Sequence, residues 1–510
     1  MSIIGKIVFV ITRIFLFNKN KNISYNDLNF KKLDFTNYKQ IKQFIFKKEF
    51  YKLNNRHVQG FEFLNFSKNL GGAVGINLSK KSIFSWYNIN KYKLKYPWSE
   101  DFTSKRFINM VYNYEFINSA SNNNDRKTLD NIIYLHIERL IYDFNKKKLS
   151  EITCYDLVAN YLSCFIIKKI NDRNINYIDM VLDYQIDKFG MHKSYNVVEH
   201  AKYINSLNEL KNIFLYFENK ISKKFEETII RMSSILNEYF HSDGSIPLFN
   251  GSNNNYTKII NSSLNKEEYL KSRNFENTNN GIAFYSDKNK KIFFDVVQPN
   301  KDKISSYLSA GTLSFEMSFL NEKIITNCGA SETYGKNPEY LRYSAAHSTI
   351  ILQNTNISEV KENNPHIKFP QSVTFNFSKN EKETIFEGSH NGYIKKFNKI
   401  VKRKIVINHK KALISGEDTI ISLKKRDNRT IYHIRFHLNS GISFNFSNSK
   451  RNLILKSKNN SMWLFRSDME LLVEDSIIVD KNMTNPTKQI VIKGIALNTK
   501  QIRKWSLEKI

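Results

Sequence analysis

The sequence is poor in the residues that cross-link or break up a chain. Its 510 residues include three cysteines and seven prolines, and no two cysteines form a C-x-x-C pair. This scarcity excludes a disulfide framework and a thiolate zinc site, so Cys154, Cys164 and Cys328 are expected to be small buried residues. No proline occurs between Pro97 and Pro247, and this favours a long array of helices.

Long apolar runs are missing as well. The N-terminal run from Ile7 to Phe17 is interrupted by Arg13 and is too short to span a membrane. It lacks a small-residue cleavage site, which makes it a poor signal peptide and leaves a cytoplasmic location open. A short membrane-surface helix, with Lys6 and Arg13 on its polar side, would give a peripheral membrane contact and also stays open.

Acidic residues are outnumbered: 48 Asp and Glu face 78 Lys and Arg, a net charge of +30. One interpretation is a polyanionic partner such as nucleic acid, an acidic membrane or an acidic polysaccharide. The other is coding bias, since Lys, Asn and Ile are abundant together. No helix-turn-helix, RRM or zinc-finger pattern is present, which argues against a nucleic-acid partner. Length and a hydrophobic content of 41% predict a globular protein of two or more domains.

The first half of the chain carries a helical pattern. Residues 104–112 look helical, and Trp86 and Trp98 are expected in loops before them. Between residues 125 and 240, apolar residues recur at helical spacing in four stripes. The stripes are Ile133, Ile137, Leu140, Ile141 and Phe144; Leu157, Tyr161, Cys164 and Phe165; Val197, Ala201, Ile204, Leu207, Leu210 and Ile213; and Ile229, Met232, Ile235, Leu236 and Tyr239.

The pattern changes after a polar, Asn-rich stretch between Phe249 and Asn280. From Gly281 on, short runs alternate as strands do. The clearest runs are 282–285, 291–297, 400–407, 412–415, 431–438, 453–455 and 490–495. A block of helices followed by a block of strands predicts two domains, all-α and then all-β.

One stretch, residues 311–352, organises the second half. Leu313, Phe315, Met317 and Phe319 alternate with polar residues, which predicts a strand with one buried face. A turn and a returning strand follow, and the chain enters another strand at Ser348. His347 stands at the mouth of that strand, and strand ends beside irregular loops often carry binding groups.

This stretch resembles the C-terminal domain of the heparinase II/III-like family. The resemblance rests on a Ser-Phe-Glu strand at 314–316, an Asn-Cys-Gly turn at 327–329 and an Ala-His-Ser-Thr strand start at 346–349. Members with characterised activity are polysaccharide lyases. The resemblance implies an incomplete (α/α) toroid followed by an antiparallel β-sandwich, and a location in the cell envelope or periplasm. The domains expected are an apolar and basic segment at 1–30, the toroid at 31–275 and the β-sandwich at 276–510.

Two segments resemble the family's toroid motifs. The first, Gly190–Asn196, leads into the helix that carries His200, and the second is His241–Asn250. The first segment departs from the family at Lys193–Asn196, and Gly251 replaces the usual acid. These departures leave room for altered specificity or lost activity. The family's chemistry predicts His192, Tyr195 and His200 as catalytic residues.

The family also implies a divalent metal, usually zinc, held by two histidines and a carboxylate in the β domain. His347 and His390 match the histidine motifs, and Glu359 is the predicted carboxylate. In the strand at 431–438, His433, Arg435 and His437 share one face and are expected to support the site. Against each assignment stands a simpler one, because a lone histidine is more often a hydrogen-bonded structural residue.

The predicted function is cleavage of an acidic, uronate-containing polysaccharide by β-elimination. Asn250, Arg342 and Arg435 are the predicted substrate-binding residues, since the uronate carboxylate must be neutralised when the neighbouring proton leaves. No pair of catalytic carboxylates occurs at a recognisable motif, which disfavours hydrolysis. The alternative is a catalytically impaired protein that binds acidic glycans on the same scaffold.

Overall fold

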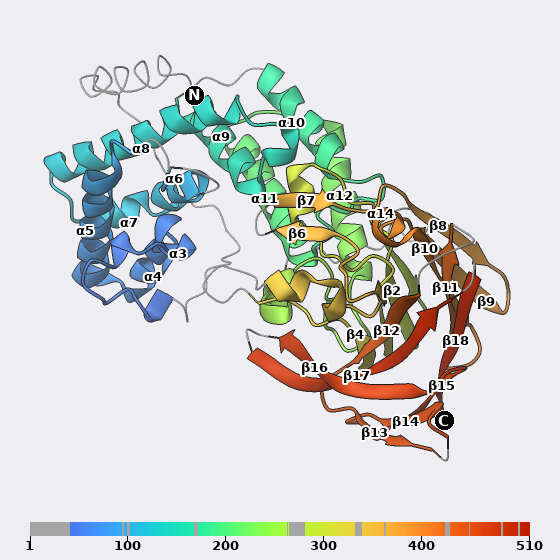
Figure 1. Cartoon of the computed structure of the whole chain (residues 1–510). Helices are drawn as coiled ribbons and strands as arrows, with labels where there is room; N and C mark the ends of the chain where they lie inside the picture. Colours follow the sequence, from blue (N-terminus) through green and yellow to red (C-terminus); the bar gives the residue numbers. More distant parts are fainter. Residues whose placement is uncertain are drawn as a thin grey trace. The chain divides into compact units, whose positions relative to one another are not determined.

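The structure is a computed structural model, described for residues 41–93, 96–98, 102–167, 172–262, 264, 281–331, 339–361, 364–423, 429–447, 449–480, 483–497 and 500–510. The predicted order is confirmed: helices come first and antiparallel strands follow (Figure 1). The predicted N-terminal segment 1–30 lies outside the described residues. None of the helices in the described part of the chain combines the length and the apolar character that a membrane span needs.

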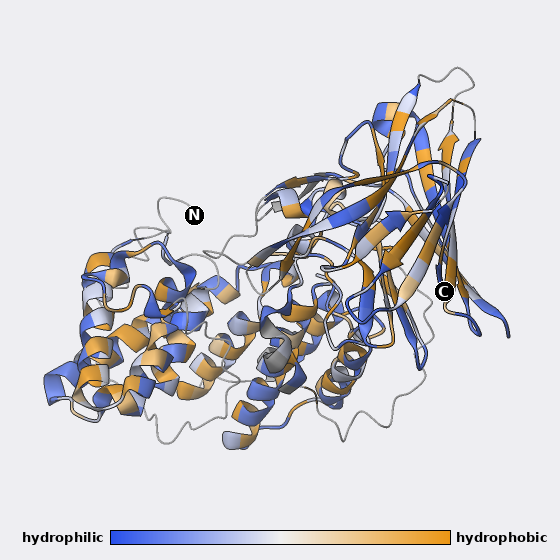
Figure 2. Ribbon diagram, turned by 90° about the horizontal axis from the view of Figure 1, so that it is seen from below, coloured by the Kyte–Doolittle hydropathy of each residue, from blue (hydrophilic) through white to orange (hydrophobic). Residues whose placement is uncertain are grey.

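The helices of the first half include α3 (Arg56–Gln59), α4 (Phe63–Leu70), α5 (Gly72–Asn90), α6 (Phe102–Tyr112), α7 (Tyr114–Asn118), α8 (Asn123–Phe144), α9 (Cys154–Ile166), α10 (Asp172–Gln185), α11 (Val197–Tyr216), α12 (Lys223–Glu238) and α13 (Thr257–Ser262). The four predicted apolar stripes lie on α8, α9, α11 and α12, and almost all of their side chains are buried. Figure 2 shows that the helices carry both hydrophobic and hydrophilic residues along their length. The pattern predicted them because burial of one face fixes the spacing of apolar residues.

Local capping also fixes where the helices begin. The Asn122 side chain accepts a hydrogen bond from the backbone N–H of Asp125 at the start of α8. At α9, Thr153 and Asp156 form a reciprocal capping box, which satisfies two backbone donors that the first turn leaves open.

Helix α5 contradicts one expectation. Trp86 lies inside this helix and is fully buried, not in a loop. The helix contains Gly75 and several serines, so its sequence lacks the clean apolar spacing that reveals α8 or α12. Trp86 packs edge-on against Phe61 and Trp98, and this tertiary packing outweighs the weak local helix propensity.

The strands form two large antiparallel sheets. The strands of the first sheet are β1 (Ile282–Ser286), β2 (Lys290–Asp295), β3 (Phe315–Phe319), β4 (Glu322–Thr326), β5 (Ile350–Leu352), β12 (Thr430–Leu438), β16 (Leu471–Asp480) and β17 (Met483–Ala496). They pair in the order β1-β2-β3-β4-β12-β17-β16, with β5 also on β12.

The strands of the second sheet are β8 (Val373–Lys379), β9 (Glu383–His390), β10 (Lys399–Asn408), β11 (Leu413–Ser422), β13 (Ser443–Phe446), β14 (Asn452–Lys456), β15 (Met462–Ser467) and β18 (Lys500–Lys509). Their order is β13-β14-β15-β18-β11-β10-β9-β8, and β6 (Glu359–Lys361) pairs separately with β7 (Asn364–Lys368). A short helix, α14 (Ile394–Phe397), joins β9 to β10.

The two sheets share one apolar core. Phe315 and Phe436 of the first sheet pack against Trp505 of the second, with ring centroids 5.4 and 4.9 Å apart. Phe465 of β15 stacks on the other side of Trp505. Residues of both sheets belong to one buried cluster, which is the arrangement of a β-sandwich.

The chain divides into two compact units. Unit 1 comprises residues 1–184 and 202–229, and unit 2 comprises residues 185–201 and 230–510. Unit 2 therefore contains both sheets and also the two segments that resemble toroid motifs. The domain boundaries predicted from the sequence stay a prediction.

Candidate functional site

A buried carboxylate, Glu316 of β3, is the centre of a polar cluster in unit 2. One of its oxygens accepts hydrogen bonds from the backbone N–H groups of Leu248 and Asn327, at 3.1 and 2.9 Å. The other accepts from Lys323 Nζ at 3.2 Å and from His241 Nε2 at 2.9 Å. The carboxylate thus ties the loop that carries His241 and Leu248 to the β3–β4 hairpin.

The charges in this cluster balance. Burial alone would raise the pKa of Glu316, but Lys323 and the bond from His241 lower it to about 2. Burial and the charge of Lys323 lower the pKa of His241 to about 4. At neutral pH the cluster therefore contains one carboxylate, one ammonium and one neutral imidazole. His241 thus has a structural role in the site.

The predicted single buried face of β3 is wrong. Ser314, Glu316 and Ser318, on the face expected to be polar and open, are as buried as Phe315 and Met317. The Ser318 hydroxyl lies 2.9 Å from His241 Nδ1, so the loop that follows α12 covers this face. Alternation in the sequence shows which residues share a face, but not whether a distant loop covers it.

His347 is buried at the entrance to β5, as predicted. Its Nδ1 lies 2.9 Å from the Tyr343 carbonyl oxygen. Because a carbonyl only accepts, Nδ1 carries the proton and Nε2 presents a lone pair. Burial lowers the pKa of His347 to about 4, so the imidazole is neutral at pH 7. Gly311 leaves room for the ring: a Cβ there would stand 2.6 Å from Cδ2 of His347.

The sequence motifs around His347 are joined by hydrogen bonds. The Asn327 side chain accepts from the Ser348 N–H at 2.9 Å. The Ser348 hydroxyl donates to the Thr326 carbonyl and accepts from the His437 N–H. His437 itself is bonded at both ring nitrogens, to the Ser476 hydroxyl and the Ala345 carbonyl, so it supports the loop behind His347.

Arg342 is buried close to His347 in the sequence and organises the same loop. Its guanidinium donates to the backbone carbonyls of Lys361, Ser306 and Leu308, at 2.7 to 2.9 Å. Within the described ranges it forms no ion pair with a carboxylate. The nearby carboxylate of Glu339 partly offsets the positive charge of Arg342, and most of the guanidinium N–H groups bond the protein itself.

The loop before α11 holds Tyr195. Its hydroxyl donates to the carboxylate of Asp187, which also accepts from the N–H groups of Phe189 and Met191, each at 2.9 Å. Burial raises the pKa of Asp187, and burial together with Asp187 raises the pKa of Tyr195. The tyrosine is thus a protonated phenol next to an acceptor.

His192 and His200 contact each other through the backbone. The His192 N–H donates to His200 Nδ1 at 3.2 Å, and His200 Nε2 lies 2.9 Å from the Met232 carbonyl. Both nitrogens of His200 are therefore occupied. The His192 ring bonds the Ser194 hydroxyl, and burial lowers the pKa values of His192 and His200 to about 3 and about 4. Both imidazoles are therefore neutral at pH 7, and their hydrogen bonds hold the loop in its conformation.

Asn250 connects this loop to the rest of unit 2. Its side-chain oxygen accepts from the Ser309 N–H at 3.0 Å, and its amide donates to the Tyr195 carbonyl at 3.4 Å. Both Asn250 and Tyr195 have positive φ, 53° and 47°. A non-glycine residue in this region is held there by its surroundings, often at functional sites.

The predicted metal ligands do not come together. The described residues contain no group of three or more His, Cys, Asp or Glu side chains placed to hold a metal. Glu359 is half-exposed in a 2.8 Å ion pair with Lys368. His390 is buried at the end of β9, where Nδ1 accepts from the Gly392 N–H. His347, His390 and Glu359 therefore do not form a three-ligand cluster in this structure, and the reaction proposed below uses no metal.

Arg435 lies on the polar face of β12, as predicted from alternation. Its guanidinium donates to Glu474 at 2.9 Å and to Gln489 at 3.0 Å. The opposite face, with Tyr432, Ile434 and Phe436, belongs to the sandwich core. Arg435 is thus part of an ion pair on the first sheet.

Sequence reasoning missed a buried ion pair that supports the motif loop. Arg403 of β10 makes a two-pronged contact with Asp418 of β11, at 2.6 and 3.0 Å. The same guanidinium donates to the carbonyls of Leu313 and Ser348, so the second sheet holds the loop beside His347. The signal was available: Arg403 falls on the inward-facing positions of an alternating strand.

Asp295, at the end of β2, was also missed. It is buried, accepts from the Val297 N–H at 3.0 Å and lies within electrostatic reach of Tyr195. Burial raises the pKa of Asp295 to about 7. The only sequence signal is an acid that directly follows the apolar run Ile292–Phe294.

Comparisons with known proteins agree with this architecture. Residues 272–506 match the family described as heparinase II/III-like, C-terminal. The comparison with curated proteins found no match.

Among solved structures, a heparinase III covers 99% of this chain and 90% of its own at 11% identity, with a TM-score of 0.70. A heparan sulfate lyase HepC mutant from Pedobacter heparinus covers 98% of this chain and 88% of its own at 13% identity, with a TM-score of 0.62. A Paenibacillus xanthan lyase covers 99% of this chain and 56% of its own at 9% identity, with a TM-score of 0.53. At these identities the likeness establishes the fold, and it confirms the predicted toroid followed by a β-sandwich.

Proposed function

Residues 272–506 of this chain are a heparinase II/III-like C-terminal domain, and on that premise we propose that the protein is a polysaccharide lyase. Its substrate would be an acidic, uronate-containing polysaccharide, cleaved by β-elimination. The observation that carries the proposal is the His347 imidazole, whose Nδ1–H bond to the Tyr343 carbonyl leaves Nε2 as a proton acceptor. It is the one histidine predicted for the site whose fixed tautomer suits a base.

The reaction assigns a task to each group. His347 Nε2 takes the proton from C5 of the uronate, the C4–oxygen bond breaks, and a C4–C5 double bond forms. The departing oxygen must gain a proton, so the step consumes one base and one acid. The positive charge of Arg342, which is hydrogen-bonded to backbone carbonyls, favours the negative charge that develops on the uronate carboxylate.

Tyr195 is the proposed acid. Its hydroxyl is protonated and bonded to Asp187. After the hydroxyl passes its proton to the departing oxygen, the phenolate regains a proton from water, while His347 releases the proton that it took from C5. His192 and His200 are proposed as positioning residues, because their ring nitrogens bond the loop itself. Asn250 is proposed to hold Tyr195 in place through its backbone.

Two parts of the assignment rest on the family resemblance. A location in the cell envelope fits an extracellular acidic substrate. Zinc at His347 and His390 stays a prediction, tested by elemental analysis of protein purified without chelator. Metal content that is unchanged in both His347→Ala and His390→Ala would rule it out.

A second function, binding of acidic glycans without cleavage, is favoured by a separate observation. Most polar groups of the predicted site bond within the protein: Arg342 to carbonyls, Asn250 to backbone and Arg435 to Glu474. Few of them are open to a substrate. A protein with this arrangement would hold an anionic chain through its net charge of +30.

The deciding experiment follows the ultraviolet absorbance of an unsaturated uronate with a panel of acidic polysaccharides. Product formation that is lost in His347→Ala supports the lyase. Polysaccharide that binds at low salt without any product supports the binding protein. If nothing acidic binds at low salt, both proposals fail.

A further inference from the structure

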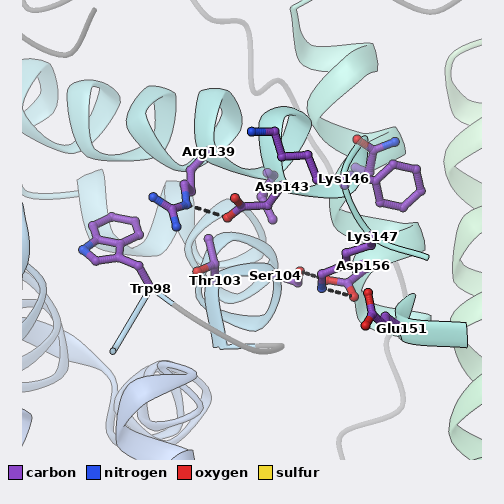
Figure 3. A pocket seen from close by; sticks show the side chains of 12 residues that line it. Trp98, Thr103, Ser104, Arg139, Asp143, Lys146, Lys147, Glu151 and Asp156 are labelled. Carbon is purple, nitrogen blue, oxygen red and sulfur yellow. Dashed lines mark hydrogen bonds and ion pairs between the residues drawn. The ribbon is translucent and has the colours of Figure 1, made fainter. Parts of the chain in front are cut away.

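Unit 1 contains a pocket that the proposed lyase chemistry does not use. It has a volume of about 270 Å³ and lies among α6, α8 and α9. A pocket of this size can hold a small polar ligand about as large as one sugar ring. Figure 3 shows Trp98 and Arg139 towards one end of it, with Asp156 and Glu151 towards the other.

The walls offer groups that suit a hydroxylated ring. Trp98 and Phe144 provide aromatic surface, and Thr103, Ser104 and Asn160 provide small polar groups. Aromatic faces with nearby planar polar side chains are typical of small-molecule sites in which a few polar groups fix orientation.

Two ion pairs use four of the six charged side chains that line the pocket, and Lys146 and Glu151 are the other two. Arg139 contacts Asp143 at 2.5 Å, and Lys147 contacts Asp156 at 2.6 Å. The Ser104 hydroxyl also donates to Asp156. Asp143 is thus the counter-charge of Arg139 at this end of the pocket, and burial raises its pKa.

Behind that end lies a second guanidinium group. Arg106 of α6 is fully buried and donates to the Gln59 carbonyl, the Thr103 hydroxyl and His136 Nε2. His136 is a neutral acceptor, because its Nδ1 bonds the Ile132 carbonyl. In the described part of unit 1, no carboxylate contacts Arg106.

The positive charge of Arg106 lies directly behind two residues that line the pocket. The Arg106 guanidinium lies 5.1 Å from the Trp98 ring and 3.2 Å from the Thr103 hydroxyl, and both residues line the pocket. Burial lowers the pKa of Arg106, and the nearby charge of Arg139 lowers it further. A buried charge without a counter-ion is costly, so an anion at this end of the pocket would be stabilised by both guanidinium groups.

We propose that this pocket binds one acidic sugar unit, a pyranose ring that carries a carboxylate or a sulfate. The anion faces Arg139 and the charge of Arg106, and the ring lies among Trp98, Phe144 and the small polar side chains. The site belongs to unit 1 and does not require that the protein cleave anything.

Calorimetric titration of the full chain tests the proposal with glucuronate, glucose 6-sulfate and glucose as probes. We expect one site per chain for at least one of the two anions, and binding of glucose at least tenfold weaker. Removal of a charge-assisted contact should cost about tenfold or more in affinity, so Arg139→Gln should weaken binding by that factor. Asp143→Asn removes a negative charge from the same end and should tighten binding severalfold.

Two further variants serve as controls for the location of the site. Lys224→Gln removes a lysine from an exposed ion pair in the same unit and should leave affinity unchanged. Asp183→Asn, which removes the other partner of that exposed pair, should also leave it unchanged. Equal binding of glucose, anion binding that Arg139→Gln does not weaken, or no binding of any probe would each overturn the proposal. If Arg106→Gln folds, it should weaken binding as Arg139→Gln does.

Discussion

The buried cluster around Glu316 gives the sharpest test of how the site is held together. Replacement of Glu316 by Gln keeps the size of the side chain and one acceptor oxygen for the Leu248 and Asn327 N–H groups. It removes the negative charge, and the new amide N–H faces the Lys323 ammonium. That ammonium is almost fully buried, so the variant contains an unpaired buried charge.

Loss of one partner from a buried ion pair costs about 3–5 kcal/mol. For a unit of this size each kcal/mol lowers the melting temperature by about 2–4 °C, so Glu316→Gln should lower it by about 6 °C or more. The matched control is Glu359→Gln, the same chemical change in an exposed pair with Lys368, which should cost less than about 1 kcal/mol.

A second substitution isolates the cause. If the unpaired ammonium is the source of the loss, Glu316→Gln combined with Lys323→Met should be more stable than Glu316→Gln alone, because no buried charge is left. Urea unfolding followed by tryptophan fluorescence measures all four proteins. A Glu316→Gln variant as stable as Glu359→Gln, or a double variant less stable than the single one, would refute the reasoning.

Two further predictions concern pH and turnover. His192, His200 and His241 have pKa values of about 3 to 4 in the folded chain against about 6.5 unfolded, so the unfolded chain takes up more protons and stability falls as the pH drops below 6.5. Asp295, with a raised pKa of about 7, opposes this, but burial lowers the pKa values of His347, His390 and His437 in the same way as those of the first three. The net loss of unfolding free energy between pH 7 and 5 should therefore be at least about 3 kcal/mol; urea midpoints that do not fall over this range contradict it. His347→Ala should lower lyase turnover by about a hundredfold or more while polysaccharide affinity changes severalfold at most, and a variant that keeps its turnover would remove His347 from the reaction.

The regular elements were largely predictable because burial imposes a period on the sequence. The stripes on α8 and α12 follow a buried face that sets their spacing, whereas α9 and the strand at 431–438 are also buried on the side that carries polar residues. Prediction failed where a segment from elsewhere in the chain packs against the element. The polar face of β3 is covered by a loop from outside the sheet, and α5 is held by packing around Trp86.

The site was predictable only in part, for a related reason. A motif shows which residues are near one another in the chain, but the partners of a buried charge come from distant segments. Lys323 meets Glu316 across a hairpin, whereas Arg403 and Asp418 come from the other sheet and reach the loop beside His347. Charged residues on inward-facing strand positions are the sequence signal for such partners.

The hydrogen bonds distinguish the residues that hold the site together from the one residue that can take a proton. Glu316, Asn250 and Arg342 each bond two or more segments, and their hydrogen-bonding capacity is mostly used. His347 keeps Nε2 available, but burial lowers its pKa to about 4, which makes it a weak base in the free protein. An anionic sugar beside the ring would favour the imidazolium and raise this pKa. The substrate's own charge would thus move the base towards the pH at which proton transfer is most efficient.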